Sequence, residues 1–207
     1  SAPATVTLTV QNVNDAPIAA DDAYTTTEDV MLQVTAPSAG VLANDTDIDA
    51  GTTLTAVQDS GPVTGTLTLA ADGTLTYEPP AHYNGIVTFT YHADDGLANS
   101  NAATVVITVT AVNDPPVVAN DAYTTNLNTS LVIAAPGVLS NDDDVEGDPL
   151  TATLSVPPLH GTAMIGPDGA LTYTPTLGYV GADSLTYRAG DGVLETEGSV
   201  SLWVNAP

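Results

Sequence analysis

Apolar and polar residues alternate with a period of two along most of the chain, and no stretch of ten residues carries the apolar stripe of a helix. This alternation is typical of β-strands with one buried face. It predicts seven strands in the first half of the chain, at Ala23–Thr26, Val30–Thr35, Leu54–Val57, Thr64–Leu69, Thr74–Glu78, Ile86–His92 and Thr104–Thr110. Gly, Pro, Asn and Asp separate the strands, and Gly73 and Gly169 are expected to supply the positive φ of tight hairpins.

The pattern occurs twice. VNDAP at Val13–Pro17 returns as VNDPP at Val112–Pro116, a period of 113 − 14 = 99 between Asn14 and Asn113, and the match continues to the end of the chain while small deletions shorten the offset to 95. Residues 14–112 are therefore predicted to form repeat 1 and residues 113–207 repeat 2. Because residues 4–17 resemble residues 103–116, residues 1–13 are expected to be the last strand and linker of a preceding repeat.

Seven short strands in about a hundred residues predict an antiparallel β-sandwich for each repeat. Each copy is long enough to bury a core of its own. The expected core of repeat 1 is Val34, Leu42, Leu54, Leu67, Leu75, Tyr77, Phe89, Tyr91, Val105 and Ile107. The expected core of repeat 2 is Ile133, Leu139, Leu150, Leu171, Tyr173, Leu185, Tyr187, Val200 and Leu202.

Charge changes the picture, because 25 Asp and Glu stand against one basic residue, Arg188, and the formal net charge is −24. Ion-pair networks are excluded for lack of cations, and phosphate backbones and anionic headgroups would be repelled, which excludes nucleic acid as a partner. The apolar content of 43% argues against a disordered acidic tail. The chain has no Cys, and no apolar run long enough to insert into a membrane.

Two acidic loops carry the candidate chemistry. NDTDIDAG at residues 44–51 returns as NDDDVEGD at residues 141–148, so each repeat presents carboxylates at alternate positions of a loop. This spacing can converge on one hard cation, and an oxygen-only ligand set without His or Cys favours Ca²⁺. The candidate ligands in the loops are Asn44, Asp45, Asp47, Asp49, Asn141, Asp142, Asp144, Glu146 and Asp148. The alternative is an Asx-rich surface turn without metal.

Further acidic and amide residues recur in both copies and complete the set of candidate Ca²⁺ ligands. They are Asn14, Asp15, Asp22 and Asp95 in repeat 1, with Asn113, Asp114, Asp121 and Asp191 in repeat 2. If each sandwich places its linker and acidic loop at the same end, a cation there would make the linker rigid. Glu28 has no acidic counterpart in repeat 2, which reads NLN at Asn126–Asn128.

The strings VNDAP, DDAYTTTED, GVLANDTDID, GTLTLAADGTLTYEP and YNGIVTFTYHADDG resemble the tandem cadherin-like and bacterial Ig-like repeats, the VCBS-type modules, of large bacterial surface adhesins and secreted RTX-type proteins. The resemblance covers essentially the whole chain. It implies two tandem Ig-like or cadherin-like β-sandwiches that bind calcium, lie outside the cell or on the bacterial surface, and contact neighbouring repeats of the same chain. A glycan or host surface would be contacted through other domains.

No catalytic residues are predicted, because the sequence has no nucleophile elbow and no HExxH, and its paired carboxylates lie in motifs that occur twice. His82, His92 and His160 have no His at the equivalent positions and are expected at the surface or at strand edges. The alternative function is a calcium-dependent carbohydrate-binding module, for which Trp203 is the best stacking residue, although a core position is expected for it. A third interpretation is that the acidity reflects a high-salt habitat without specific metal.

Overall fold

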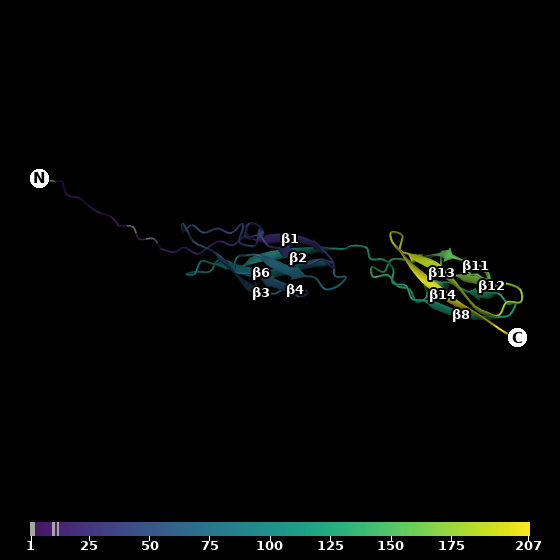
Figure 1. Ribbon diagram of the computed structural model, residues 1–207. Coiled ribbons are helices and arrows are strands. Elements are labelled where there is room, and N and C mark those ends of the chain that lie inside the picture. The colour runs from purple at the N-terminus through teal and green to yellow at the C-terminus, as the bar shows by residue number, and fades with distance from the viewer. Residues whose placement is uncertain (1–2, 10, 12) are drawn as a thin grey trace. The chain divides into compact units, whose positions relative to one another are not determined.

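The computed structural model describes residues 3–9, 11 and 13–207, and the chain divides into two compact units, residues 1–112 and 113–207. Each unit is a β-sandwich of seven strands (Figure 1). The predicted fold, two tandem seven-stranded sandwiches, is confirmed. In the described part of the chain, helix is limited to two short 3₁₀ turns, Pro37–Ala39 and Gly137–Leu139. Neither comes near the length and apolarity that a membrane-spanning helix requires.

Repeat 1 pairs a four-stranded sheet, in the order β1-β7-β6-β3, with a three-stranded sheet, in the order β2-β5-β4. Its strands are β1 (Asp22–Thr27), β2 (Leu32–Val34), β3 (Thr55–Ser60), β4 (Thr66–Leu69), β5 (Leu75–Glu78), β6 (Gly85–Asp94) and β7 (Ala103–Thr110). Each predicted strand has its counterpart, and the ends differ by up to three residues because tertiary pairing, rather than alternation, sets where a strand stops.

Repeat 2 has the same topology, with sheets β8-β14-β13-β10 and β9-β12-β11. Its strands are β8 (Asp121–Asn126), β9 (Leu131–Ile133), β10 (Thr151–Val156), β11 (Gly161–Ile165), β12 (Leu171–Pro175), β13 (Gly181–Gly190) and β14 (Glu195–Asn205). The hairpin glycines adopt the expected conformation, with φ of +83° at Gly73 and +82° at Gly169. An L residue with a side chain pays a steric cost at such angles.

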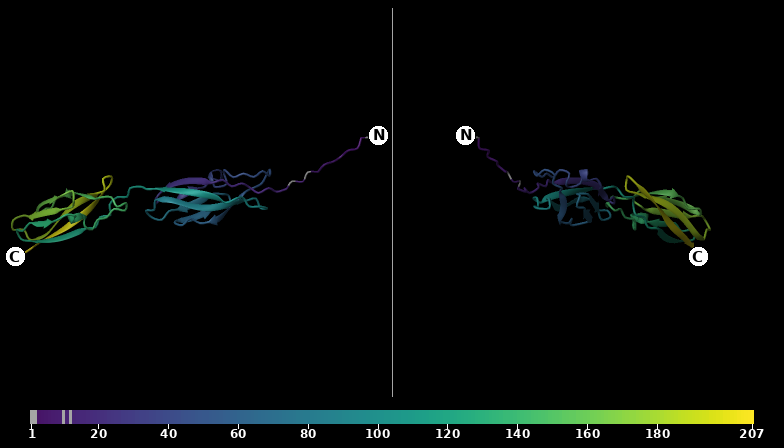
Figure 2. Two further views of the ribbon diagram at one scale, coloured as in Figure 1. Left: turned by 180° about the vertical axis from the view of Figure 1, so that it is seen from behind. Right: turned by 60° about the vertical axis from the view of Figure 1, so that its left-hand side comes forward.

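One strand pair in each repeat is parallel, whereas the others are antiparallel. The first strand pairs with the last, β1 with β7 and β8 with β14. Since the first and last strands run in the same direction, the chain enters a repeat at one end of the sandwich and leaves it at the opposite end (Figure 2). If the first and last strands were antiparallel, the chain would enter and leave the repeat at the same end. The parallel pair suits a module that is joined head to tail.

The period-two pattern decides which side chains are buried. In β7 the odd-numbered residues from Ala103 to Val109 are buried and the residues between them are partly exposed. All ten predicted core residues of repeat 1 are buried or pack against the core. In repeat 2 the same holds for eight of the nine, since Leu150 is only partly buried and borders a surface hollow instead.

One expectation is corrected by the structure, and another stays open. Trp203 is 51% exposed rather than in the core, because it lies between the buried residues Leu202 and Val204 on β14 and so faces outward. Residues 3–9 form no strand and their side chains are exposed. The strands that would pair with this segment belong to a preceding repeat, so the assignment of residues 1–13 to the last strand and linker of such a repeat stays a prediction. The rest of the predicted first strand, at residues 1–2, 10 and 12, lies outside the described residues.

Candidate functional site

The acidic loop of each repeat is fixed against the segment that leads into the sandwich. In repeat 1, Ile18 and Thr46 exchange two backbone hydrogen bonds, of 2.8 and 3.0 Å. In repeat 2, Val117 and Asp143 exchange equivalent bonds of 2.8 and 3.0 Å. The structure therefore brings linker and loop to the same end within each repeat, an arrangement that the sequence left as a condition.

Three carboxylates of repeat 1 lie on the outer side of this junction. The backbone N–H of Asp15 donates to Asp49 Oδ2 at 2.8 Å, and the N–H of Asp49 donates to Asp47 Oδ1 at 2.8 Å. A surface hollow of about 410 Å³ borders the junction and is lined by residues that include Asp15 and Asp47. The loop and the linker thus present acidic oxygens to one surface hollow.

We call the carboxylates on the outer side of the junction the outer group. Repeat 2 has an equivalent outer group with four acids instead of three, namely Asp114, Asp144, Glu146 and Asp148. The N–H of Asp114 donates to Glu146 Oε2 at 3.3 Å, and Asp144 Oδ1 accepts from the N–H groups of Glu146 and Asp148 at 3.1 and 3.0 Å. The adjoining hollow, of about 310 Å³, is lined by five carboxylate residues, Asp142, Asp143, Asp144, Asp148 and Asp168. Asp168 comes from the β11–β12 hairpin, so only the fold could associate it with the loop.

A second group joins the linker to the turn between the last two strands. Asn14 Nδ2 donates to Asp95 Oδ2 at 2.9 Å, and Asn113 Nδ2 donates to Asp191 Oδ2 at 2.9 Å. Hydrogen bonds from Asn14 and from the Ala98 and Leu97 N–H groups lower the pKa of Asp95. The pKa of Asp191 is likewise lowered, by backbone hydrogen bonding at Leu194 and by Asn113. Both carboxylates are thus already stabilised as anions by the protein.

A third group faces the interior, around a buried tyrosine. The hydroxyl of Tyr91 lies 2.6 Å from Val41 O, 3.0 Å from Asp45 Oδ1 and 3.2 Å from Asp22 Oδ2. Burial, together with the charge of Asp45, raises the pKa of Asp22 to about 6, against the hydrogen bond from Tyr91. Burial also raises the pKa of Asp45.

The interior group recurs in repeat 2. The Tyr187 hydroxyl lies 2.8 Å from Asp142 Oδ2 and 2.9 Å from Val138 O, and burial raises the pKa of the neighbouring Asp121. The first carboxylate of each acidic loop, Asp45 or Asp142, thus contacts the core tyrosine while the later ones do not. The loop asparagines brace the same region, since Asn44 Nδ2 donates to Asp21 O at 3.1 Å and Asn141 Nδ2 to Ala119 O at 3.3 Å.

One oxygen in each outer group is buried without a partner. Asp47 Oδ2 and Asp144 Oδ2 are among the few buried side-chain oxygens of the described residues that accept no hydrogen bond. They occupy equivalent positions, Asn44 + 3 and Asn141 + 3, of the two loops. Buried carboxylate oxygens normally have a donor or a cation. No lysine exists in the chain, and Arg188 is paired with Glu195 and Glu197.

This donor set fits a hard cation, because it consists of carboxylate oxygens beside backbone carbonyls. In the described part of the chain, however, no three carboxylates of one acidic loop bring one oxygen each within 4.8 Å of one another. A cation held at either loop therefore requires backbone carbonyl, amide or water oxygens as well.

Glu28 is a buried carboxylate that the sequence reasoning did not include among the ligands. Its side chain is 3% exposed, Oε1 accepts from the Val112 N–H at 2.6 Å, and Oε2 has no partner. In repeat 2 the equivalent residue is Leu127, which keeps only the backbone bond, to Asn205 O at 3.0 Å. The available signal in the sequence was the replacement of Glu28, in the string TED, by an apolar residue in NLN of repeat 2.

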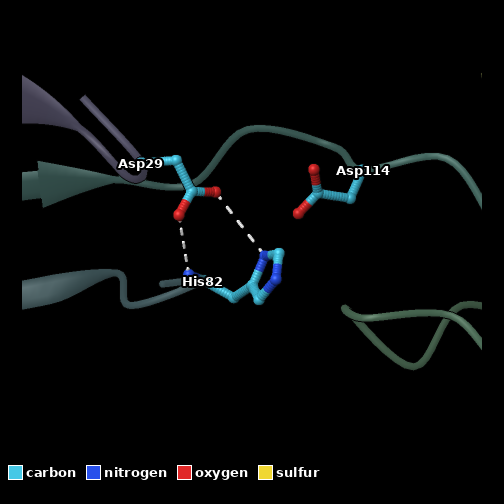
Figure 3. A group of neighbouring side chains, drawn as sticks. All are labelled: Asp29, His82 and Asp114. Atoms are coloured by element: carbon cyan, nitrogen blue, oxygen red, sulfur yellow. Dashed lines mark hydrogen bonds and ion pairs between the residues drawn. The ribbon is translucent and has the colours of Figure 1, made fainter. Parts of the chain in front are cut away.

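The histidines lie apart from the acidic loops, as expected of surface and strand-edge residues. His82 and Asp29 are both exposed, and the His82 N–H donates to Asp29 Oδ1 at 3.0 Å while Nδ1 lies 3.5 Å from Oδ2 (Figure 3). In repeat 2, Asn128 accepts from the Gly178 N–H at 2.8 Å in the same place. This contact is therefore a loop tether that works without a histidine. His92 pairs with Asp59 at 2.7 Å, and His160 stacks on Tyr179.

Solved structures share the architecture. The EC1-2 segment of human protocadherin-24 is 18% identical, with a TM-score of 0.62 over 93% of this chain and 99% of that one. Human CDH23 repeats EC21-23 are 18% identical, with a TM-score of 0.56 over 92% of this chain and 69% of that one. At these identities the likeness concerns the fold alone.

An endo-fucoidan hydrolase of glycoside hydrolase family 107 is 22% identical, with a TM-score of 0.40 over 93% of this chain. The chain spans 29% of that hydrolase's length, and this likeness carries no argument about activity. No curated protein matches the chain significantly.

The family model described as the bacterial cadherin-like domain matches residues 14–111 and again residues 113–206. The two matches together cover most of the chain and coincide with the two duplicated sandwiches. The chain therefore belongs to the bacterial cadherin-like domain family, of which it carries two tandem copies.

Proposed function

We propose that the chain is a pair of non-catalytic, calcium-stabilised structural repeats from an extracellular bacterial adhesin. The observation that carries the proposal is the buried oxygen without a partner on Asp47 and, at the equivalent position, on Asp144. An acidic surface turn that needs no metal would expose these oxygens to water instead. The recurrence of the arrangement in both repeats argues that it belongs to the module.

The residues that would hold the cation are those of the outer group. In repeat 1 they are Asp15, Asp47 and Asp49, and in repeat 2 they are Asp114, Asp144, Glu146 and Asp148, with Asp168 beside them. Asp95 and Asp191 border the same junction through Asn14 and Asn113. Asp22, Asp45 and Asp142 would act from the interior, where they accept from the core tyrosines Tyr91 and Tyr187. Asp121 lies beside them and accepts from the Tyr123 hydroxyl at 3.2 Å.

A bound Ca²⁺ would supply the positive charge that the sequence lacks at each cluster. The chain's own residues then do the structural work, because the same carboxylates that would bind the ion also hold the lead-in segment by accepting from the Asp15 and Asp114 N–H groups. Extracellular calcium modules have dissociation constants of about 10⁻⁴ to 10⁻³ M. Binding to the folded state alone stabilises it by about 2.7 kcal/mol at a hundredfold excess over that constant.

The strand topology supports the structural role. Because the chain enters and leaves each sandwich at opposite ends, repeats of this kind can be joined in a series that places a distal domain away from the cell. In such a series, residues 1–13 would be the last strand and linker of a preceding repeat, and the partners would be neighbouring repeats of the same chain. A distal domain would contact the glycan or host surface.

The test compares thermal melts in metal-depleted buffer and in about 10 mM CaCl₂, with NaCl at matched ionic strength. We expect Ca²⁺ to raise Tm by about 10 °C, from about 2 kcal/mol at about 4–8 °C per kcal/mol. Asp47→Asn and Asp144→Asn should each lose most of the Ca²⁺ effect on the transition of their own repeat. The matched control is Glu78→Gln, which neutralises an exposed carboxylate on β5 and should leave the Ca²⁺ effect on Tm unchanged.

Two outcomes would contradict the proposal. Equal stabilisation by NaCl at the same ionic strength would indicate general screening, as in a protein adapted to high salt. Unchanged calcium titrations of both asparagine variants would mean that the acidic loops are not the binding sites.

A further inference from the structure

The outward face of the four-stranded sheet in repeat 2 changes from charged to neutral along β14. From Glu195 onward, every second residue faces outward, in the order Glu195, Glu197, Ser199, Ser201, Trp203 and Asn205. Arg188 pairs with both glutamates at the charged end. The other end carries hydroxyls, an amide and an indole, which is unusual in a chain with a net charge of −24.

Trp203 lies at the centre of this neutral end, which we call the Trp203 face. Its register partners on the neighbouring strands are Thr124 of β8 and Ala182 of β13, and all three side chains are exposed. Ser201 and its partner Ser184 come next along the strands. Adjacent strands lie about 4.8 Å apart. The indole is therefore flanked by small side chains that leave its surface accessible, with hydroxyl groups within reach of a ligand lying on it.

The face is also hollowed. A depression of about 290 Å³ adjoins the indole and is lined by Thr124, Ser201 and Trp203, among others. This volume is near the lower end of small-molecule sites, about 300 Å³. Asp183 also borders this depression, but it is only 8% exposed and its carboxylate accepts from the Leu159 and His160 N–H groups. Asp121 is equally buried, on the inner side of β8. They therefore place little negative charge at the surface of the face.

We propose that the Trp203 face is a binding site for a neutral, β-linked hexopyranose chain. An aromatic plane recognises the apolar C–H face of such a ring, while hydroxyl and amide side chains bond its equatorial hydroxyls. Phosphorylated, sulfated or uronic acid ligands are disfavoured by the charge of the chain. The site is independent of the calcium proposal, because no acidic-loop residue contributes to it.

Repeat 1 provides an internal comparison. The position equivalent to Trp203 is Thr108, whose register partners are Thr25 of β1 and Ile86 of β6. The flanking threonine is thus kept, the indole is missing, and an isoleucine that is 66% exposed replaces Ala182. Repeat 1 therefore offers the same sheet without the platform.

The experiment uses the full two-repeat chain. Because Trp203 is the only tryptophan, its emission reports on the site without labelling. Titration with cellohexaose, laminarihexaose or mannohexaose to about 5 mM should give a saturable blue shift with at least one of them, whereas oligogalacturonate should give none. By calorimetry, Trp203→Thr should weaken binding about tenfold or more, and Trp203→Phe should give an intermediate affinity.

A gain of function completes the test. The double substitution Thr108→Trp with Ile86→Ala rebuilds the arrangement in repeat 1 and should raise the stoichiometry from one to two. Binding should persist in metal-depleted buffer below the melting temperature, so its failure and the failure of the calcium proposal are separable. Three outcomes would overturn the inference: no binding of any neutral hexasaccharide, unaltered affinity in Trp203→Thr, or a blue shift with protein concentration alone, which would mean that the face pairs with a second copy.

Discussion

The backbone N–H of Asp15 donates to the side chain of Asp49 at 2.8 Å and so joins the segment that leads into repeat 1 to the far end of its acidic loop. The two residues are 34 positions apart, and both belong to motifs that recur in repeat 2. There the corresponding bond, from Asp114 to Glu146, is 3.3 Å long. The longer glutamate side chain makes the same connection less tightly.

This difference predicts unequal effects of neutral substitutions. Asp49→Asn should destabilise repeat 1 by about 1 kcal/mol, because it replaces a charge-assisted hydrogen bond by a neutral one. Glu146→Gln should cost repeat 2 less. Hydrogen exchange at the Asp15 and Asp114 amides, measured in metal-depleted buffer, checks this directly. Equal acceleration at both amides would contradict the inference from the bond lengths.

The core tyrosine predicts a larger effect. Tyr91→Phe removes the hydroxyl that lies between the Val41 carbonyl and the partly buried carboxylates of Asp22 and Asp45. These acceptors lose a shared donor, although Asp45 Oδ1 still accepts from the Ala20 N–H. We expect a loss of about 1–3 kcal/mol in the free energy of unfolding, measured by urea denaturation, and a similar loss for Tyr187→Phe. Tyr24→Phe is the matched control, since its hydroxyl donates to Ala39 O at an exposed site and should cost less. If Tyr24→Phe lowered the free energy of unfolding as much as Tyr91→Phe, the loss could not be attributed to the contact between Tyr91 and the carboxylates.

The raised pKa of Asp22 predicts an unusual pH dependence without metal. Its pKa is about 6 in the folded chain against an ordinary value of 3.8, so the folded state binds the proton more tightly than the unfolded state. The resulting stability is fully present below the unfolded pKa and is lost as the pH rises through about 6. Burial raises the pKa of Asp45 and Asp121 in the same direction. Thermal melts in metal-depleted buffer should therefore show Tm rising as the pH falls from about 7 to about 5.

Asp95 and Asp191 determine how far Tm can rise as the pH falls. Their pKa values are lowered in the folded state, so their stabilising contribution is present above the unfolded value and is lost as the pH falls through the folded one. Tm should therefore pass through a maximum and fall in more acidic buffer. A Tm that decreases steadily from neutral pH would contradict the assignment of Asp22.

Local alternation and duplication predicted most of the fold, because both are read along the chain. They could not predict the parallel pairing of β1 with β7, since the side-chain pattern of a strand is the same for either direction of its neighbour. Trp203 was misplaced because hydrophobicity alone suggested burial. Its neighbours Leu202 and Val204 already fill the buried positions of that strand.

The sequence likewise predicted one part of the candidate site and missed another. The spacing of Asp45, Asp47 and Asp49 suggested a single ligand set, but the fold turns Asp45 towards Tyr91 and leaves a buried oxygen on Asp47. Which carboxylate faces the interior depends on the loop backbone and on a tyrosine 46 residues away from Asp45. Residues that converge from distant hairpins, such as Asp168, carry no local signal at all. Those contacts are properties of the tertiary structure.

The single basic residue of the chain allows one repeat to be monitored alone. Trypsin can cleave only after Arg188, which lies within β13 and has register partners on both sides, Thr153 of β10 and Glu197 of β14. Cleavage therefore requires repeat 2 to open, and its rate follows the open population when reclosing is fast.

Removing Ca²⁺ should accelerate cleavage, and Asp144→Asn should do so by about tenfold at fixed Ca²⁺, which corresponds to about 1.4 kcal/mol. The equivalent substitution in repeat 1, Asp47→Asn, should leave the rate unchanged, because each sandwich has its own core. Acceleration by Asp47→Asn would show that the repeats unfold together, and a rate insensitive to Ca²⁺ would separate the stability of repeat 2 from its acidic loop.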